Sequence, residues 1–194
     1  MKLRASTDNR GGSVSVKSGK ADARDDNYNL DPSRRYSKVT RTLSESAGSG
    51  IGQMTVTLET SSEFVGFQKE SYECDSLAFK SVGTIKLPQD AAATATGVVH
   101  DSISLGFRVE KACRVRLTAA VTSDMDVAEV RVDGPSFAAN PVRVFDDFDD
   151  TLSIDKPGEY YLRGAYQLNV RTPNAGLGGR PIVVEMQATL TPAD

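Results

Sequence analysis

The chain has 194 residues, of which 39% are hydrophobic and 7% aromatic with no Trp, and this suits one globular domain with a sizeable core. Its formal net charge of -3 argues against the whole molecule being a nucleic-acid binder. No apolar run approaches the ~20 residues that a membrane helix needs, and the first twelve residues lack the apolar stretch typical of a secretory signal.

Residues 1–35 differ in composition from the rest of the chain. Small polar and charged residues dominate, and eight Lys or Arg against five Asp give this segment a charge of +3, which leaves -6 for the remainder. The only strand-like piece is the segment 13–16, Ser-Val-Ser-Val. We predict a flexible polar arm over residues 1–35, with a short appended strand as the alternative, and a single domain over residues 36–194.

From about residue 51, apolar and polar residues alternate with a period of two. The apolar sets that share a face are Met54, Val56 and Leu58; Ile103, Leu105, Phe107 and Val109; Cys113, Val115, Leu117, Ala119 and Val121; Tyr160, Leu162, Gly164, Tyr166, Leu168 and Val170; and Ile182, Val184, Met186, Ala188 and Leu190. This alternation is typical of antiparallel strands with one buried and one solvated face.

The segments between these runs read as turns, and no segment shows helical periodicity. The short link Glu110-Lys111 predicts a hairpin, and Lys156-Pro157-Gly158-Glu159 predicts a type II turn in which Gly158 takes a positive φ. Residues 173–180 predict a longer loop before the last strand. The sequence therefore predicts an all-β fold, an antiparallel β-sandwich of jelly-roll type.

The two cysteines, Cys74 and Cys113, lack the spacing of a metal site. Both a disulfide and two free thiols are compatible with the sequence, because a thiol at a strand's apolar face is an ordinary small core residue.

The stretch Phe-Asp-Asp-Phe-Asp-Asp, residues 145–150, is the most acidic part of the chain. Calcium prefers six to eight oxygen ligands, and the candidate ligands are Asp146, Asp147, Asp149 and Asp150, joined by Asp124 and Asp126 from a second loop. The spacing does not match an EF-hand. The alternative is a solvated loop that Phe145 and Phe148 hold against the sheet edge.

Catalysis is not expected. The acids of residues 145–150 lie side by side, whereas glycoside hydrolysis needs two carboxylates facing each other across a cleft. His100 is the single histidine, which excludes a zinc site built on several histidines, and no Gly-x-Ser-x-Gly elbow is present.

Three residues on a predicted solvent-facing strand surface are candidate ligand contacts: Tyr161, Arg163 and Gln167. By alternation, Tyr160 and Tyr166 point inward to the core. The alternative for the outward set is an exposed sheet face that has no partner.

Residues 101–171 resemble the pre-peptidase C-terminal type of β-sandwich domain that is appended to secreted bacterial enzymes. The resemblance rests on DSISLGFRVEKACRVRL, on the acidic loop and strand DMDVAEVRVDG, and on LSIDKPGEYYLRGAYQLNV. It implies a non-catalytic domain of a kind in which some members bind calcium or polysaccharide, with Asp124, Asp126, Asp146 and Asp147 in similar loops. The chain departs from the family pattern at residues 110–112, where the turn has no Gly.

We therefore expect a non-enzymatic, extracellular or surface β-sandwich that binds a protein, a polysaccharide or copies of itself, with no required cofactor and calcium as a candidate ligand. The alternative is a structural subunit of an assembly, such as a virion or surface layer, in which the arm of residues 1–35 orders on a neighbouring subunit.

Overall fold

The computed structural model describes residues 2–18, 21–29, 37–90, 92–124, 128–172 and 180–193, and for residues 21–29 the backbone only. The strands are β1 (Leu3–Ser18), β2 (Ala21–Asn29), β3 (Lys38–Ala47), β4 (Met54–Val65), β5 (Glu73–Cys74), β6 (Ser76–Lys86), β7 (Ala95–Val109), β8 (Cys113–Ser123), β9 (Ala128–Asp133), β10 (Val142–Val144), β11 (Phe148–Ile154), β12 (Gly158–Arg171) and β13 (Ile182–Ala193). Within the described residues, the helical elements are two single 3₁₀ turns, η1 (Gly50–Gly52) and η2 (Pro135–Phe137). No helix in this part of the chain has the length and apolarity needed to cross a membrane.

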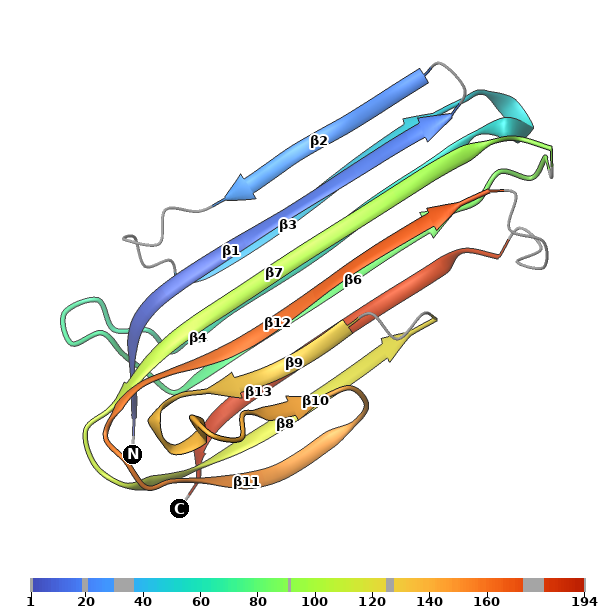
Figure 1. Ribbon diagram of the computed structural model, residues 1–194. Helices are drawn as coiled ribbons and strands as arrows, with labels where there is room; N and C mark the ends of the chain where they lie inside the picture. The colour runs from blue at the N-terminus through green and yellow to red at the C-terminus, as the bar shows by residue number, and fades with distance from the viewer. Residues whose placement is uncertain are drawn as a thin grey trace.

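The strands form two antiparallel sheets that pack face to face (Figure 1). The seven-stranded sheet has the order β10-β9-β12-β7-β1-β2, with β5 also paired to β1, and the six-stranded sheet has the order β11-β8-β13-β6-β4-β3. The predicted all-β antiparallel sandwich is confirmed.

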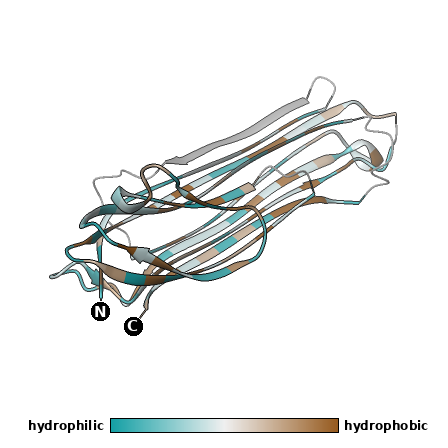
Figure 2. Cartoon of the chain, turned by 60° about the horizontal axis from the view of Figure 1, so that its bottom comes forward, coloured by the Kyte–Doolittle hydropathy of each residue, from teal (hydrophilic) through white to brown (hydrophobic). Residues whose placement is uncertain are grey.

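The hydrophobic core lies between the two sheets and is made from one face of each. Along the long strands hydrophobic and hydrophilic residues alternate (Figure 2), and the apolar sets predicted from β4, β7, β12 and β13 are buried. The apolar set of β8 is also buried from Val115 to Val121, whereas Cys113 at its start is only half-buried. A period of two therefore located the inner face of these strands correctly.

The first strand is the main departure from the sequence-based prediction. Residues Leu3–Ser18 form β1 inside the larger sheet, between β7 and β2, where a flexible arm is predicted. The prediction is wrong for these residues because Asp8, Arg10 and Gly12 occupy inward positions, so the apolar alternation that marks a buried strand is interrupted.

After β1, the structure describes only residues 21–29 of the predicted arm. Ala21–Asn29 form β2, the strand at the edge of the larger sheet, paired with β1 from Gly11 to Ser18. Residues 1, 19, 20 and 30–36 lie outside the described residues.

The connection predicted as a hairpin joins strands of different sheets. β7 pairs with β1 and β12, whereas β8 pairs with β11 and β13, so Glu110-Lys111 links the two sheets instead of two neighbours in one sheet. The link before Gly158 likewise joins β11 of one sheet to β12 of the other, and Gly158 has the predicted positive φ, 148°. Residues 173–179 of the predicted loop before β13 lie outside the described residues.

Both cysteines are free thiols. Cys74 lies in β5 and is completely buried, and burial raises the pKa of its thiol to about 12. Cys113 is half-buried at the start of β8, and burial raises its pKa as well. The sequence left the pairing open, and the structure has no disulfide between them.

The two ends of the sandwich carry different loops. The N- and C-termini lie at the same end (Figure 1), together with the β7–β8 link and the loop of residues 66–72 before β5. The candidate site described below lies at this end.

Candidate functional site

The acidic stretch of residues 145–150 is divided between a loop and a strand. Phe145–Asp147 form the link from β10 to β11, and Phe148–Asp150 begin β11 itself. Asp146 and Asp147 line a hollow of about 610 Å³ together with Phe145 and residues from β8 and β9.

The other described acids of the predicted calcium set have partners elsewhere. Asp149 receives two hydrogen bonds from Arg116, at 2.7 and 2.6 Å, and Arg116 holds the pKa of this carboxyl below its ordinary value. Asp150 accepts a hydrogen bond from the amide of Thr151 at 2.6 Å. These two carboxylates therefore point to neighbours within their own sheet.

Asp124 lies at the end of β8 and accepts a hydrogen bond from the amide of Val183 at 2.9 Å. Asp126 lies outside the described residues. Across the described part of the chain, no group of three or more His, Cys, Asp or Glu side chains is placed to hold a metal ion. Calcium binding by this set stays a prediction of the sequence.

The two phenylalanines of the acidic stretch differ in exposure. Phe148 packs against the core at the start of β11, as predicted, but Phe145 is 56% exposed. The expectation that both rings hold the loop against the sheet is therefore wrong for Phe145, because its side chain lies on the linking segment and not on the strand.

The predicted ligand contacts lie on the outer face of β12, but only two of them meet. The Arg163 guanidinium carbon lies 4.8 Å from the centre of the Tyr161 ring, and Arg163 also forms an ion pair with Asp133 at 3.4 Å. Burial and the neighbouring Glu159 raise the pKa of the Tyr161 hydroxyl. Gln167 is four residues beyond Arg163, about 13 Å along an extended strand, so it belongs to a different part of the face.

Arg163 belongs to a row of three arginines on neighbouring strands. Arg143, Arg131 and Arg163 stand directly opposite one another on β10, β9 and β12. Like charges in these positions repel, but Asp133 and Glu129 form ion pairs with all three. This row is therefore largely neutralised by its own carboxylates.

His100 lies on the same outer face, in β7. The strand register places Ser13 of β1 directly across from it, and Gln167 of β12 on its other side. Among the described residues, no hydrogen bond joins Ser13 to His100, and no acid is hydrogen-bonded to the imidazole. The arrangement lacks the linked nucleophile, base and orienting group of hydrolytic sites.

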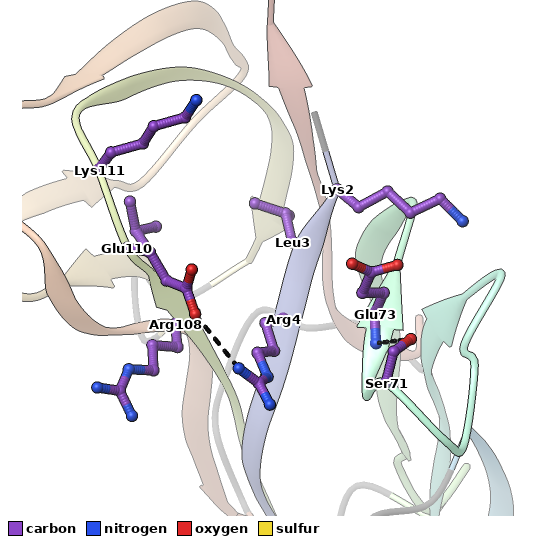
Figure 3. Close-up of a pocket in the computed structure, with 9 residues that line it drawn as sticks. Lys2, Leu3, Arg4, Ser71, Glu73, Arg108, Glu110 and Lys111 are labelled. Carbon is purple, nitrogen blue, oxygen red and sulfur yellow. Dashed lines mark hydrogen bonds and ion pairs between the residues drawn. The ribbon is translucent and has the colours of Figure 1, made fainter.

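A hollow lined by charged side chains lies at the end of the sandwich that carries the termini; we call it the basic end pocket (Figure 3). It encloses about 670 Å³, which is within the range of small-ligand sites. Its lining residues are Lys2, Leu3, Arg4, Ser71, Glu73, Arg108, Val109, Glu110 and Lys111.

Strand pairing builds the centre of the basic end pocket. Arg4 of β1 stands directly opposite Arg108 of β7 on one side and Glu73 of β5 on the other. The β7–β8 link then adds Glu110 and Lys111. Three strands and one short link therefore bring together charges that are more than 100 residues apart in the chain.

The loop of residues 66–72 positions the side of the pocket formed by Ser71 and Glu73. Tyr72 has a φ of 58°, a left-handed conformation that is costly for a bulky residue. Its carbonyl accepts a hydrogen bond from the amide of Ala5 at 2.8 Å, and its ring lies 6.2 Å from that of Phe67. These contacts hold the loop against β1 and so define that wall of the pocket.

The electrostatics of the basic end pocket contrast with those of the whole chain. Four basic and two acidic side chains line it, in a protein of net charge -3. Arg4 forms an exposed ion pair with Glu110 at 3.2 Å, while Arg108 and Lys111 form no ion pair with any described residue. Two positive charges therefore remain available to a ligand.

A separate polar group lies inside the core. Asp101 of β7 is completely buried, and Thr60 and Ser81 from the opposite sheet face its carboxyl group. The Tyr166 hydroxyl lies 3.0 Å from that of Ser81. We call these four residues the polar core cluster.

Burial is the largest influence on Asp101 and raises its pKa to about 6, while the facing Ser81 and Thr60 hydroxyls oppose the rise. Neither carboxyl oxygen makes a hydrogen bond of ordinary geometry within the described residues. A perturbed pKa often marks a functional site, but Asp101 is sealed between the sheets and no substrate reaches it.

Two glycines make room for the polar core cluster. A Cβ atom at Gly12, directly across from Asp101, would lie 2.5 Å from the Leu58 side chain and 3.0 Å from an Asp101 oxygen. A Cβ atom at Gly83 would lie 2.9 Å from the Tyr166 ring and hydroxyl. These positions therefore accept no larger residue without rearrangement of the cluster.

Sequence reasoning did not identify the basic end pocket. Lys2 and Arg4 fall in the predicted arm, and Arg108 is one polar residue among several on an alternating strand. The missing information is the pairing of β1 with β7, which no local pattern reports.

No protein-family model matches this chain, and no curated protein matches it. Among solved structures, the chain is similar to the GH31 alpha-xylosidase of Xanthomonas citri at 9% identity and a TM-score of 0.24, over 94% of this chain and 32% of that one. The chain thus spans about a third of that enzyme, and a TM-score this low carries no argument about fold or function.

Proposed function

We propose that this protein is a non-catalytic β-sandwich binding module that acts outside the cell or at its surface, and that its ligand occupies the basic end pocket. The observation that carries the proposal is the pocket itself: about 670 Å³ lined by four basic and two acidic side chains. Arg4 and Arg108 stand on paired strands, so their positions are held by the sheet and need little ordering when a ligand binds.

The pocket residues also support binding without catalysis. The carboxylates of the pocket are Glu73 and Glu110, and Glu110 is paired with Arg4 at the exposed rim. Binding, and not turnover, is what this set of side chains supports.

The alternative, an assembly subunit whose arm orders on a neighbour, needs a strand that is free to leave its own domain. β1 is paired on both sides within its own sheet. β3, an edge strand of the other sheet, carries the charged residues Lys38, Arg41 and Glu45, and charged side chains on an edge strand oppose edge-to-edge association. No observation favours this second function.

The test is a ligand screen on the full chain, labelled with ¹⁵N and followed by amide chemical shifts, against peptides and neutral and acidic oligosaccharides. We expect at least one ligand to shift the amides of residues 2–4, 71–73 and 108–111, and mass spectrometry to recover that ligand unchanged. Binding confined to another part of the surface, or chemical conversion of the ligand, would refute the proposal.

A further inference from the structure

We infer that the basic end pocket takes an acidic sugar, a ligand whose carboxylate or sulfate group lies between Arg4 and Arg108. This inference rests on the proposed function and names its ligand class.

The first step is the position of the two guanidinium groups. Arg4 and Arg108 are direct partners across β1 and β7, and their side chains lie on the same side of the sheet (Figure 3). Like charges in directly opposite positions destabilise a sheet pair. An anionic oxygen group between them removes the repulsion and accepts hydrogen bonds from both forks, which match the geometry of carboxylate and sulfate.

The second step is that the protein already supplies one such group. Glu110, on the link after β7, accepts a hydrogen bond from Arg4 at 3.2 Å, and both side chains are exposed. Arg108 forms no ion pair with a described residue, although Glu159 of β12 stands directly opposite it in the sheet. Glu110 therefore competes with a ligand anion for Arg4, but only weakly, because an exposed ion pair contributes little stability.

The third step is the remainder of the lining. Glu73 forms no ion pair with a described residue, and with Ser71 it offers oxygen acceptors to ligand hydroxyl groups on the far side of Arg4. The apolar members, Leu3 and Val109, are only 1% and 5% exposed, so they offer almost no apolar floor. A ligand that is polar over its whole surface, with hydroxyl donors beside an anionic group, fits this lining; a peptide that needs apolar anchors does not.

The last step excludes a simple polyanion. A pocket of about 670 Å³ is larger than one phosphate or sulfate ion needs. Glu73 and Glu110 would repel a ligand charged along its whole length. The combination favours separated anionic groups on a hydroxylated ring.

The experiment measures dissociation constants by calorimetry for the full chain and four probes: a galacturonic acid trisaccharide, a κ-carrageenan tetrasaccharide, neutral galactotriose and inorganic sulfate. We expect one or both acidic sugars to bind at least tenfold more tightly than the other two probes, and affinity to fall with added salt. The first two arms distinguish a carboxylate from a sulfate.

Three variants locate the site. Arg108→Gln should weaken acidic-sugar binding about tenfold or more, since hydrogen bonds to an ionised group are lost. Glu110→Gln should strengthen it about two- to fivefold by removing the competitor of Arg4. Arg114→Gln, which removes the same charge from an exposed position on β8, should leave it unchanged.

The outcomes separate the inference from the proposed function. Equal binding of galactotriose and the acidic probes, with shifts at the pocket amides, would overturn the acidic-sugar inference and leave the binding module intact. Failure of both acidic probes to bind at millimolar concentration would also overturn it, and the broader ligand screen then decides the proposed function. Weakening by Arg114→Gln equal to that by Arg108→Gln would show that only net charge attracts the ligand.

Discussion

Asp101 is an ionisable carboxyl group that lies completely buried between two sheets. Folding raises its pKa from 3.8 to about 6, because burial disfavours the charged form. The charged groups nearest on the adjoining strand are Asp8 and Arg10, which are also buried and hydrogen bond to each other at 3.2 Å. Arg10 extends toward Phe64, whose ring centre is 5.9 Å from the guanidinium carbon.

We predict that Asp101→Asn stabilises the protein at pH 8 and not at pH 4. A raised pKa means that the protonated carboxyl contributes full stability below pH 3.8 and that this contribution is lost as pH rises through about 6. The variant avoids the loss, which for this change of pKa amounts to roughly 3 kcal/mol. Denaturant unfolding of both proteins between pH 4 and pH 8 measures the difference.

The control for this prediction is Asp155→Asn, which removes a carboxylate from an exposed position. Its free energy of unfolding should follow that of the parent protein across the same pH range. If Asp101→Asn is no more stable at pH 8 than at pH 4, relative to the parent, the buried carboxyl does not carry the pH dependence.

Tyr160 joins two loops to the core through its hydroxyl group. The hydroxyl donates to the carbonyl of Lys156 at 2.6 Å, accepts from the amide of Ser136 at 3.2 Å, and lies 2.7 Å from the Ser136 hydroxyl. Ser136 Oγ in turn accepts from the amides of Asp155 and Lys156 at 3.0 and 3.1 Å. The links before β10 and after β11 are thereby tied together.

We predict that Tyr160→Phe lowers the free energy of unfolding by about 1–3 kcal/mol, because the Lys156 carbonyl and the Ser136 amide each lose a hydrogen bond while the ring packing is kept. Ser136→Ala should cost a similar amount, and the double variant less than the sum of the two. Additive effects of the two substitutions would show that the hydroxyl groups do not act as one network.

At the scale of elements, β1 carries the largest correction to the sequence-based interpretation. It lies between β7 and β2, and its inward residues Leu3, Val14 and Val16 are at most 1% exposed. An arm of this composition is predicted to be dispensable, whereas a strand paired on both sides is not.

We predict that removal of residues 1–18 abolishes cooperative unfolding, because β7 would lose a partner and the core would lose one wall. Val14→Ala should cost roughly 1–3 kcal/mol, since Val14 is fully buried, while Ser15→Ala on the opposite face should change stability by less than about 0.5 kcal/mol. Circular dichroism melts measure all three. If the truncated chain melts cooperatively at the same temperature as the parent protein, residues 1–18 are a dispensable arm and not a required strand.

The connections show what alternation does and does not report. The polar and apolar faces of β7 and β8 are correctly predicted, but the hairpin predicted for the short link between them is wrong. The two strands lie in different sheets. A hairpin within one sheet and a link between two sheets would both bury the same side chains in the core. Period-two patterning specifies a face and not a partner.

At the scale of the whole molecule, the charges of the acidic stretch are dispersed. Three of the five described acids have partners: Asp124 with an amide of β13, Asp149 with Arg116, and Asp150 with its neighbouring amide. Only Asp146 and Asp147 line the same hollow.

We therefore predict equal melting temperatures in excess calcium and in chelator. A bound ion at a concentration 100 times its dissociation constant would stabilise the fold by ~2.7 kcal/mol, which is readily measured. A higher melting temperature in excess calcium, lost in the Asp146→Asn variant, would establish a calcium site here, with Asp126 as a further candidate ligand.

The sequence alone determined the fold class and the inner face of most long strands, because side chains alternate by local backbone geometry wherever one face is buried. It also indicated that the single histidine and the side-by-side acids do not match the catalytic arrangements of known hydrolytic sites. These features depend on neighbours one or two positions away.

Only the tertiary structure decided where β1 lies, which strands pair, and that Arg4, Arg108 and Glu73 form one row at the end of the sandwich. Arg4 and Arg108 are 104 positions apart in the chain, as their numbers show. Their proximity depends on strand register. β1 itself packs against the core although Asp8 and Arg10 interrupt its apolar pattern. Long-range pairing of this kind has no local signature, so the site became visible only with the fold.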